Sequence, residues 1–271
     1  ASQASVSISA VSISNEVAAD IFRGAEMDLA ATQKELDDGS LQMGFPIAKA
    51  TASANVDIER RRGTGRNVVA RLPAGEIAND KNPVLILGAH IDHLGMGGSS
   101  NSLATDDERD QVHVGADDNA SGVASVLEIV QYLAAEKKSG RLKPKRDMLV
   151  AAWSGEELGL FGSQAFVDDY YKLYPDAPRT MVTVSEEEAK VAHAHGVTTD
   201  AEPLTAAVAA YLNFDMVGRL REKLVVQGIG SSPEFGSEVQ RRNVPVGLAL
   251  QLDKTSTRLP TDASAFVSRD V

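Results

Sequence analysis

Residues 1–45 contain two stretches in which apolar positions recur with helical spacing. Ser14 is a typical N-cap residue, and it predicts a helix over residues 16–25. A second helical pattern covers residues 27–36 and ends at an Asp-Asp-Gly-Ser sequence. We therefore expect an N-terminal helical segment over residues 1–45, followed by a main domain over residues 46–271.

The period of the pattern changes after this helical segment. Over residues 52–58 apolar and polar residues alternate, which is typical of a half-buried strand. A turn sequence, Arg-Arg-Gly-Thr-Gly, then precedes a second strand pattern over residues 67–72. These two strands are expected to form a hairpin.

From Val84 onward, predicted strands alternate with predicted helices. Short continuous apolar runs, typical of strands buried on both faces, cover residues 84–87, 148–153 and 209–214. The other predicted elements are a helix that begins near Ser121 and ends at residues 137–140, a helix over residues 162–171, a strand over residues 223–227, and helices over residues 234–242 and 262–268. This alternation predicts an α/β fold of three layers, in which a mostly parallel mixed sheet carries helices on both faces.

Composition restricts the chemistry more than the fold. The 271 residues, 43% of them hydrophobic and 24% charged, fit one large globular domain and argue against a disordered or fibrous chain. A formal net charge of −11 repels the phosphates of nucleic acids, so we expect no nucleic-acid partner. No apolar run approaches the roughly 20 residues of a membrane span. Because the chain has no cysteine, any metal must bind to His and carboxylate side chains.

Imidazole and carboxylate side chains follow the predicted core strands. His90, Glu156 and Asp215 each lie just past the carboxyl end of such a strand, the edge at which open α/β sheets bind ligands. Asp117 and Asp118 precede a helix, and they face the same edge if that helix packs back on the sheet. Each of these residues alone is more often a helix cap or a solvated loop residue. Together they predict one site that contains a His and several carboxylates.

Four motifs occur in a fixed order along residues 67–271. They are Gly-Ala-His-Ile-Asp-His, Gly-Ala-Asp-Asp-Asn-Ala-Ser-Gly, Ser-Gly-Glu-Glu-Leu-Gly and Asn-Phe-Asp-Met-Val-Gly. This set resembles the co-catalytic zinc aminopeptidases, a family whose relatives include glutamate carboxypeptidase-type enzymes. The resemblance implies a catalytic domain with the zinc-dependent exopeptidase type of fold. Residues 6–24 of the N-terminal segment also resemble the close of a protease-associated insert found in some members.

The resemblance implies a role for each motif residue. It implies two zinc ions and the metal ligands His90, Asp117, Glu157 and Asp215. Among these, Asp117 bridges the two ions, and Asp118 follows it across a strained peptide. A bridging carboxylate suits two cations about 3.5–4 Å apart.

The remaining roles concern proton transfer, orientation and substrate contact. Glu156 is expected to be the general base that takes a proton from a zinc-activated water. Asp92 is expected to fix the orientation of His90 from the second shell of the metal site. Asp262 resembles a residue of a segment that lines the substrate pocket.

One feature of the family is missing from this sequence. The family's last metal ligand is a His beyond the segment that matches residues 261–266, and this chain ends at Val271. We therefore expect a fragment, a removed last segment or an incomplete metal site. His93 and His113 also flank the predicted site, but hydrogen bonding within loops is the simpler explanation for both.

The function that the resemblance implies is hydrolysis of the N-terminal bond of a peptide substrate by a zinc aminopeptidase. A related two-zinc carboxypeptidase or amidohydrolase uses a similar set of residues and is the alternative enzyme. A catalytically incomplete binding module is the alternative of another class, because receptor ectodomains with this fold occur in the family. The resemblance also implies a secreted or periplasmic location.

Overall fold

A computed structural model describes residues 13–41, 44, 46, 51, 53, 62–75, 82–97, 102, 104–179, 202–254 and 259–271. The chain divides into two compact units, Ala1–Arg62 and Gly63–Val271. Most of the strand predicted over residues 52–58 lies outside the described residues.

The first unit contains two short helices, α1 (Asn15–Gly24) and α2 (Leu29–Asp37). The Ser14 side chain caps α1 by accepting a hydrogen bond from Val17 N at 3.3 Å, as the sequence predicts. Asp28 caps α2 in the same way, through Ala31 N at 2.8 Å. Because Asp28 takes the N-cap position, the second helix begins two residues later than its apolar pattern indicates.

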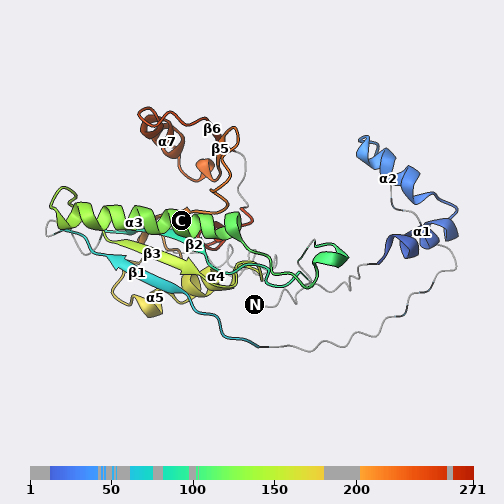
Figure 1. Ribbon diagram of the computed structural model, residues 1–271, viewed down its shortest axis with the longest axis horizontal. Helices are drawn as coiled ribbons and strands as arrows, with labels where there is room; N and C mark the ends of the chain where they lie inside the picture. Colours follow the sequence, from blue (N-terminus) through green and yellow to red (C-terminus); the bar gives the residue numbers. More distant parts are fainter. Residues whose placement is uncertain are drawn as a thin grey trace, which may run out of the picture. The chain divides into compact units, whose positions relative to one another are not determined.

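The second unit is built on a four-stranded sheet of β1 (Val68–Leu72), β2 (Val84–His90), β3 (Met148–Trp153) and β4 (Val208–Asn213). The strand order is β1-β3-β2-β4 (Figure 1). β2 runs parallel to both β3 and β4, whereas the edge strand β1 is antiparallel to β3. The prediction of a mostly parallel mixed sheet is therefore confirmed.

Helices cover both faces of this sheet (Figure 1). α3 (Gly122–Lys138) packs on β2 and β3 from one side. On the other side lie α4 (Phe161–Asp168), α5 (Tyr170–Leu173) and α8 (Ala263–Val267), whose aromatic side chains join the main core cluster. The three predicted layers are thus present. The helix predicted over residues 162–171 is divided, with α4 ending and α5 beginning at Asp169.

Alternation along β3 explains which side of the sheet faces the main core cluster. Leu149, Ala151 and Trp153 are buried and point to the side of α4 and α8, because successive side chains of a strand face opposite ways. Trp153 packs against Phe166 of α4 and Phe266 of α8, with ring centroids 5.0 and 6.0 Å apart. This aromatic cluster lies directly behind the carboxyl end of β3 and holds that end in place.

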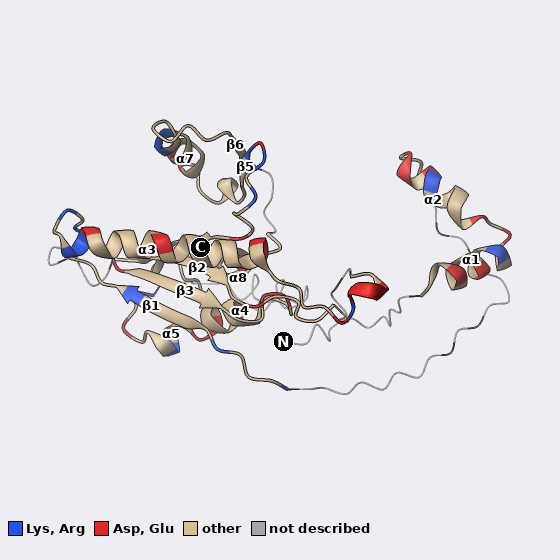
Figure 2. Ribbon diagram, viewed as in Figure 1, with Lys and Arg blue, Asp and Glu red and all other residues tan. Residues whose placement is uncertain are grey.

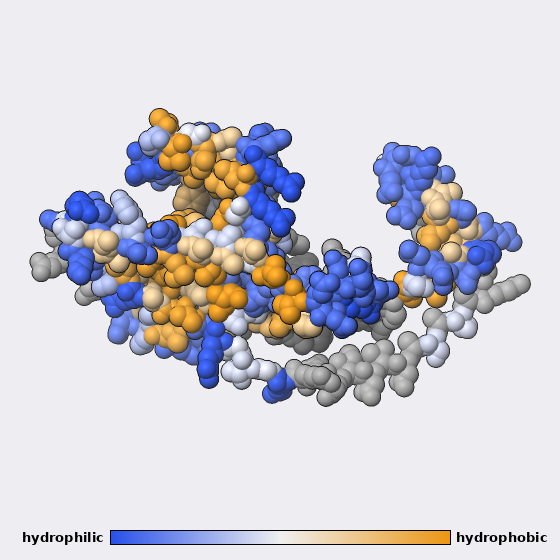
Figure 3. Space-filling view, viewed as in Figure 1, coloured by the Kyte–Doolittle hydropathy of each residue, from blue (hydrophilic) through white to orange (hydrophobic). Residues whose placement is uncertain are grey.

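α3 shows how charge and apolar surface are distributed on one helix. Its last turn carries Lys137 and Lys138, which complement the negative end of the helix dipole (Figure 2). Apolar surface is visible along α3 and beside the sheet (Figure 3). Leu127 of α3 is 63% exposed.

Among the described residues, no helix combines the length and apolar character that crossing a membrane requires.

A small parallel pair of strands, β5 (Leu224–Val226) and β6 (Leu250–Leu252), follows β4 in the chain. Between them lies α7 (Phe235–Asn243). The sequence predicts β5 and α7 close to these bounds. β6 is missed because three residues are too few to show a period.

Gly88 of β2 provides a test of the packing behind the site. A Cβ at this position would lie 2.5 Å from both Trp153 Nε1 and Tyr211 Oη, which share a hydrogen bond of 2.8 Å. Gly88→Ala should therefore lower the free energy of unfolding by about 1–3 kcal/mol, measured from denaturant midpoints. Gly63→Ala is the control, because nothing lies within 4 Å of its Cβ. Equal midpoints for the two variants would contradict this packing.

Candidate metal centre

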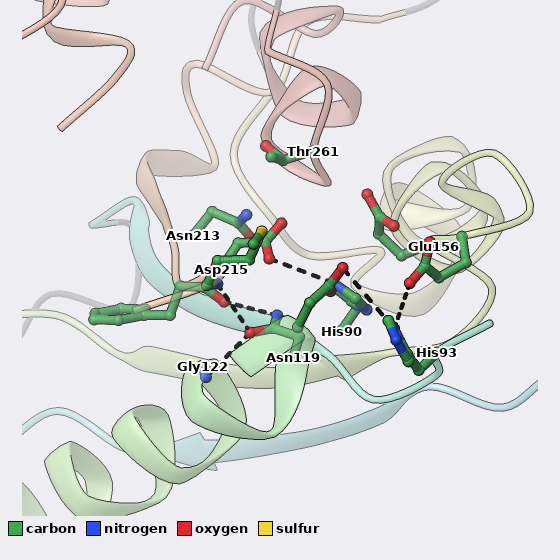
Figure 4. A network of polar contacts seen from close by, with 12 residues as sticks. His90, His93, Asn119, Gly122, Glu156, Asn213, Asp215 and Thr261 are labelled. Atoms are coloured by element: carbon green, nitrogen blue, oxygen red, sulfur yellow. Dashed lines mark hydrogen bonds and ion pairs between the residues drawn. The ribbon is translucent and has the colours of Figure 1, made fainter. Parts of the chain in front are cut away.

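His90 is the centre of the site at the carboxyl edge of the sheet. It is the last residue of β2 and is 1% exposed. Its Nδ1 lies 3.1 Å from the backbone oxygen of Asp92, which can only accept a hydrogen bond. Nδ1 must therefore carry the proton in the neutral imidazole, and the lone pair of Nε2 faces the carboxylates of the site (Figure 4).

Two carboxylates lie close to the Nε2 atom of His90. Nε2 is 3.0 Å from Asp118 Oδ1 and 3.6 Å from Asp215 Oδ1. Asp215 follows β4, the strand that pairs with β2, so the parallel register brings these two side chains together. His90 and Asp215 thus meet at the predicted edge.

Asp92 connects His90 to the loop after β3. Its carboxylate accepts hydrogen bonds from Glu156 N at 3.2 Å and Glu157 N at 3.3 Å. Its Oδ1 lies 3.9 Å from His90 Nδ1, too far for a hydrogen bond. The sequence predicts that Asp92 orients His90, and in the structure its backbone oxygen makes that contact while its carboxylate holds the two glutamates.

The adjacent residues Asp117 and Asp118 face different partners. Asp118 directs Oδ1 to His90 and lies with Oδ2 3.9 Å from His93 Nδ1. Asp117 is nearly buried, and its Oδ1 accepts a hydrogen bond from Gly218 N at 2.9 Å. The structure therefore places Asp118 in the site and uses Asp117 to anchor the loop after β4.

Local backbone geometry explains why the two aspartates diverge. Within the irregular turn η2 (Ala116–Ser121), Asp118 has φ −105° and ψ 97°, which is an extended conformation. Side chains that are adjacent in an extended segment point to opposite sides. The Asp118–Asn119 peptide bond is cis. An Asp-Asp pair in a sequence does not show which of its members points inward.

The potential metal-ligand atoms form two groups, each with its atoms within 4.8 Å of one another. The first group is His90, Glu156 and Asp215, and the second is His93, Asp118 and Glu157. The sequence predicts five of these six residues at this edge of the sheet. His93 is the exception, because it was expected to make only loop hydrogen bonds. Its signal in the sequence is the second His of Gly-Ala-His-Ile-Asp-His.

Unbalanced negative charge perturbs the ionisation of the site. Burial raises the pKa of Glu156 to about 7, and the charges of Asp262, Asp215 and Glu157 add to this effect while His90 opposes it. For His90, burial lowers the pKa, but a hydrogen bond with Asp215 and the charges of Glu156 and Asp215 outweigh it and raise the pKa to about 9. A bound cation would relieve the same repulsion. Imidazole nitrogen and carboxylate oxygen are also ligands that zinc accepts, so the residues fit a zinc site.

A cavity of about 560 Å³ opens over these groups. Its floor is formed by His90, Asp118, Glu156, Glu157 and Asp215, and its walls include Met216, Leu220, Leu224 and Val225 together with Arg219 and Lys223. Thr261 also lines it, whereas the neighbouring Asp262 is completely buried. A role for Asp262 in the substrate pocket stays a prediction. Burial raises the pKa of its carboxyl group to about 6.

Sequence comparison decides the family. The model of peptidase family M28 matches residues 67–180 and 180–271, which include every residue of the site. The chain belongs to this family. The relationship predicted from the four motifs is thereby confirmed.

The chain is also similar to individual proteins from several organisms. Leupeptin-inactivating enzyme 1 of Streptomyces exfoliatus is 31% identical over 155 residues, which cover 57% of the chain and 23% of that protein. An aminopeptidase of Pseudomonas aeruginosa is 29% identical over 182 residues, which cover 67% of the chain and 21% of that protein. A solved zinc aminopeptidase from Bacillus subtilis aligns with a TM-score of 0.45 at 21% identity, covering 74% of the chain and 36% of that structure. The chain thus spans about a fifth of the length of these two curated relatives.

Asn119 ties the start of α3 to the loop that carries Asp215 (Figure 4). Its Nδ2 donates to Phe214 O at 3.0 Å, and its Oδ1 accepts from Gly122 N at 3.1 Å. Because Asn119 is 3% exposed, water cannot easily replace these contacts. Asn119 therefore fixes the spacing between the α3 and β4 sides of the site.

Asn119→Asp should lower the free energy of unfolding by about 1–3 kcal/mol, because a buried carbonyl loses its donor. Chemical denaturation measures this change. Asn82→Asp is the matched control, since Asn82 Nδ2 donates to Lys145 O at 2.9 Å in an exposed setting. A loss no larger than that of the control would show that Asn119 does not hold the loop.

Proposed function

We propose that the chain is the catalytic part of a zinc-dependent aminopeptidase that hydrolyses N-terminal peptide bonds, with Glu156 as general base. The observation that supports this most is the convergence of His90, Asp118, Glu157 and Asp215 beside Glu156 on the floor of one cavity. Membership of the M28 peptidase family agrees with this function. The aminopeptidase from Pseudomonas aeruginosa supports the specificity for N-terminal bonds.

Two zinc ions are part of the proposal. His90, Asp118 and Asp215 would hold one ion, and Asp118 and Glu157 would take part in holding the other. Zinc, when bound, polarises a carbonyl group and lowers the pKa of its bound water to about 7.

The residues of the chain supply the proton transfer and the binding of substrate. The Glu156 carboxylate would accept a proton from the attacking water and return it to the leaving amine. The Asp92 carboxylate accepts a hydrogen bond from the backbone N–H of Glu156, which holds the general base in position. The apolar wall formed by Leu220, Leu224 and Val225 suits a hydrophobic side chain of the substrate.

A carboxypeptidase that acts on an acidic substrate is the second candidate. Arg219 and Lys223 also line the cavity, and such cations would bind a substrate carboxylate. A probable glutamate carboxypeptidase of Zea mays is 41% identical over 61 residues. The first candidate is favoured because the aminopeptidase of Pseudomonas aeruginosa aligns over 182 residues of the chain, against 61 for the carboxypeptidase.

A pair of substrates separates these candidates. With zinc supplied, leucine p-nitroanilide should be hydrolysed and its N-acetyl derivative should not, because only an aminopeptidase requires the free amine. Glu156→Gln should retain zinc and lose about 10²–10⁴-fold in rate, measured by nitroaniline release and by metal analysis. Preferential cleavage of the acylated anilide would support an amidohydrolase instead, and cleavage of an N-acylated dipeptide with a free C-terminal glutamate, with neither anilide cleaved, would support a carboxypeptidase. Loss of zinc in Glu156→Gln would show that Glu156 is a ligand.

The assignment of the inward-facing aspartate is tested by a second pair of variants. Asp118→Asn should lose most bound zinc, because the carboxylate that faces both imidazoles is removed. Asp117→Asn should retain zinc but be less stable, since Asp117 accepts from Gly218 N outside the two ligand groups. Equilibrium dialysis with metal analysis measures both. The reverse order of zinc loss would return the bridging role to Asp117.

A further inference from the structure

We propose that His93 is a metal ligand, whose Nδ1 completes a second cation position with Asp118 and Glu157. This inference rests on the proposed function and adds a residue that the family resemblance does not assign. His93 lies in the loop after β2, three residues beyond His90. It contributes the imidazole of the second ligand group, as His90 does in the first.

The distances in the second group match those in the first. His93 Nδ1 lies 2.7 Å from Glu157 Oε1 and 3.9 Å from Asp118 Oδ2. For comparison, His90 Nε2 lies 3.6 Å from Asp215 Oδ1 of the first group and 3.0 Å from Asp118 Oδ1 of the second. Ligand atoms on a tetrahedral zinc ion are about 3.3 Å apart, given zinc–ligand distances of about 2.0–2.1 Å. These four His–carboxylate distances are therefore within about 1 Å of the spacing that zinc requires.

Asp118 lies between the two imidazoles and offers one oxygen to each. Oδ1 faces His90 and Oδ2 faces His93. A carboxylate in this position can bind two cations at once, as paired catalytic metals about 3.5–4 Å apart require. Each of the two His side chains therefore lies beside a different oxygen of the Asp118 carboxylate.

Charge balance also favours a second cation. The two groups contain the four carboxylates of Asp118, Glu156, Glu157 and Asp215. One divalent ion would leave two negative charges, whereas two divalent ions neutralise the four carboxylates. Both imidazoles can then remain neutral, which is the form that binds metal.

A glycine at position 115 allows the backbone to pack closely against the ring of His93. Gly115 has φ +58°, and a Cβ there would lie 3.0 Å from His93 Cγ and 2.8 Å from Asp118 O. Only glycine avoids both the strained backbone and this contact. Gly115 therefore allows the loop before η2 to pack against the ring of His93, beside Asp118.

His113 is a natural control for His93. Its ring packs edge-on against His93 with centroids 5.9 Å apart, yet its Nε2 is bonded to Ser102 Oγ at 2.6 Å. It belongs to neither ligand group. Replacing His113 removes a neighbouring imidazole without removing a proposed ligand.

The test is the zinc stoichiometry of the full chain and its variants, measured by equilibrium dialysis with metal analysis. The wild-type chain and His113→Gln should each bind two zinc ions, and His93→Gln should bind one. Gln retains an N–H donor for Glu157 but has no imidazole, so this variant separates a metal ligand from a hydrogen-bond donor. Unfolding midpoints of the metal-free proteins show whether each variant is folded.

Two outcomes would overturn the inference, and the first of them would also overturn the two-zinc part of the proposed function. The first is a wild-type chain that binds one ion, and the second is a His93→Gln variant that still binds two with affinity reduced by no more than about 10–100-fold, the effect of a residue outside the ligand shell. A wild-type chain that binds no zinc would instead overturn the proposed function, and the inference with it.

A measurement on the wild-type chain needs no variant of His93 to fold. Nitrogen NMR of the histidine side chains during zinc titration should show Nδ1 of His93 and Nε2 of His90 changing to metal-bound shifts. The His113 nitrogens should keep their metal-free shifts. A His93 Nδ1 that keeps the shift of a protonated, hydrogen-bonded nitrogen would contradict the assignment.

Discussion

Parallel pairing of β2 with β3 and β4 is the constraint on which the site depends. It brings the carboxyl ends of three strands to one edge, so that His90, Glu156 and Asp215 meet although they are far apart in the chain. The aromatic cluster around Trp153 holds this edge from behind. Its burial supplies the packing that offsets the crowding of like charges.

The side of the site formed by α3 and the loop after β4 is fixed by polar contacts. Asp117, Asn119 and Ser121 of η2 each bond to this loop, through Gly218 N, Phe214 O and Val217 N respectively. With these three residues directed to the loop, Asp118 is the member of the turn that faces His90. One short motif therefore supplies both a proposed ligand and the contacts that position it.

The sequence predicts much of the fold, because its signals are long and periodic. The apolar runs of β2 and β3 and the capping of α1 by Ser14 correspond to the observed elements, whereas β6 is too short to show a pattern. Strand ends could also be predicted, and with them the convergence of His90, Glu156, Glu157 and Asp215.

The orientation of individual side chains could not be predicted. The backbone of Asp118 decides which of two adjacent aspartates faces the site, and no spacing rule contains that information. His93 was missed for a related reason, since its proximity to Glu157 arises only when two loops meet. The secreted or periplasmic location stays a prediction.

The most direct measurement of the central claim is the anomalous diffraction of zinc in crystals of this chain grown with the metal. The account predicts a zinc peak within bonding distance of His90 Nε2 and Asp215, with Asp118 as a further ligand. Zinc peaks found only elsewhere, with His90 and Asp215 free of metal, would contradict it.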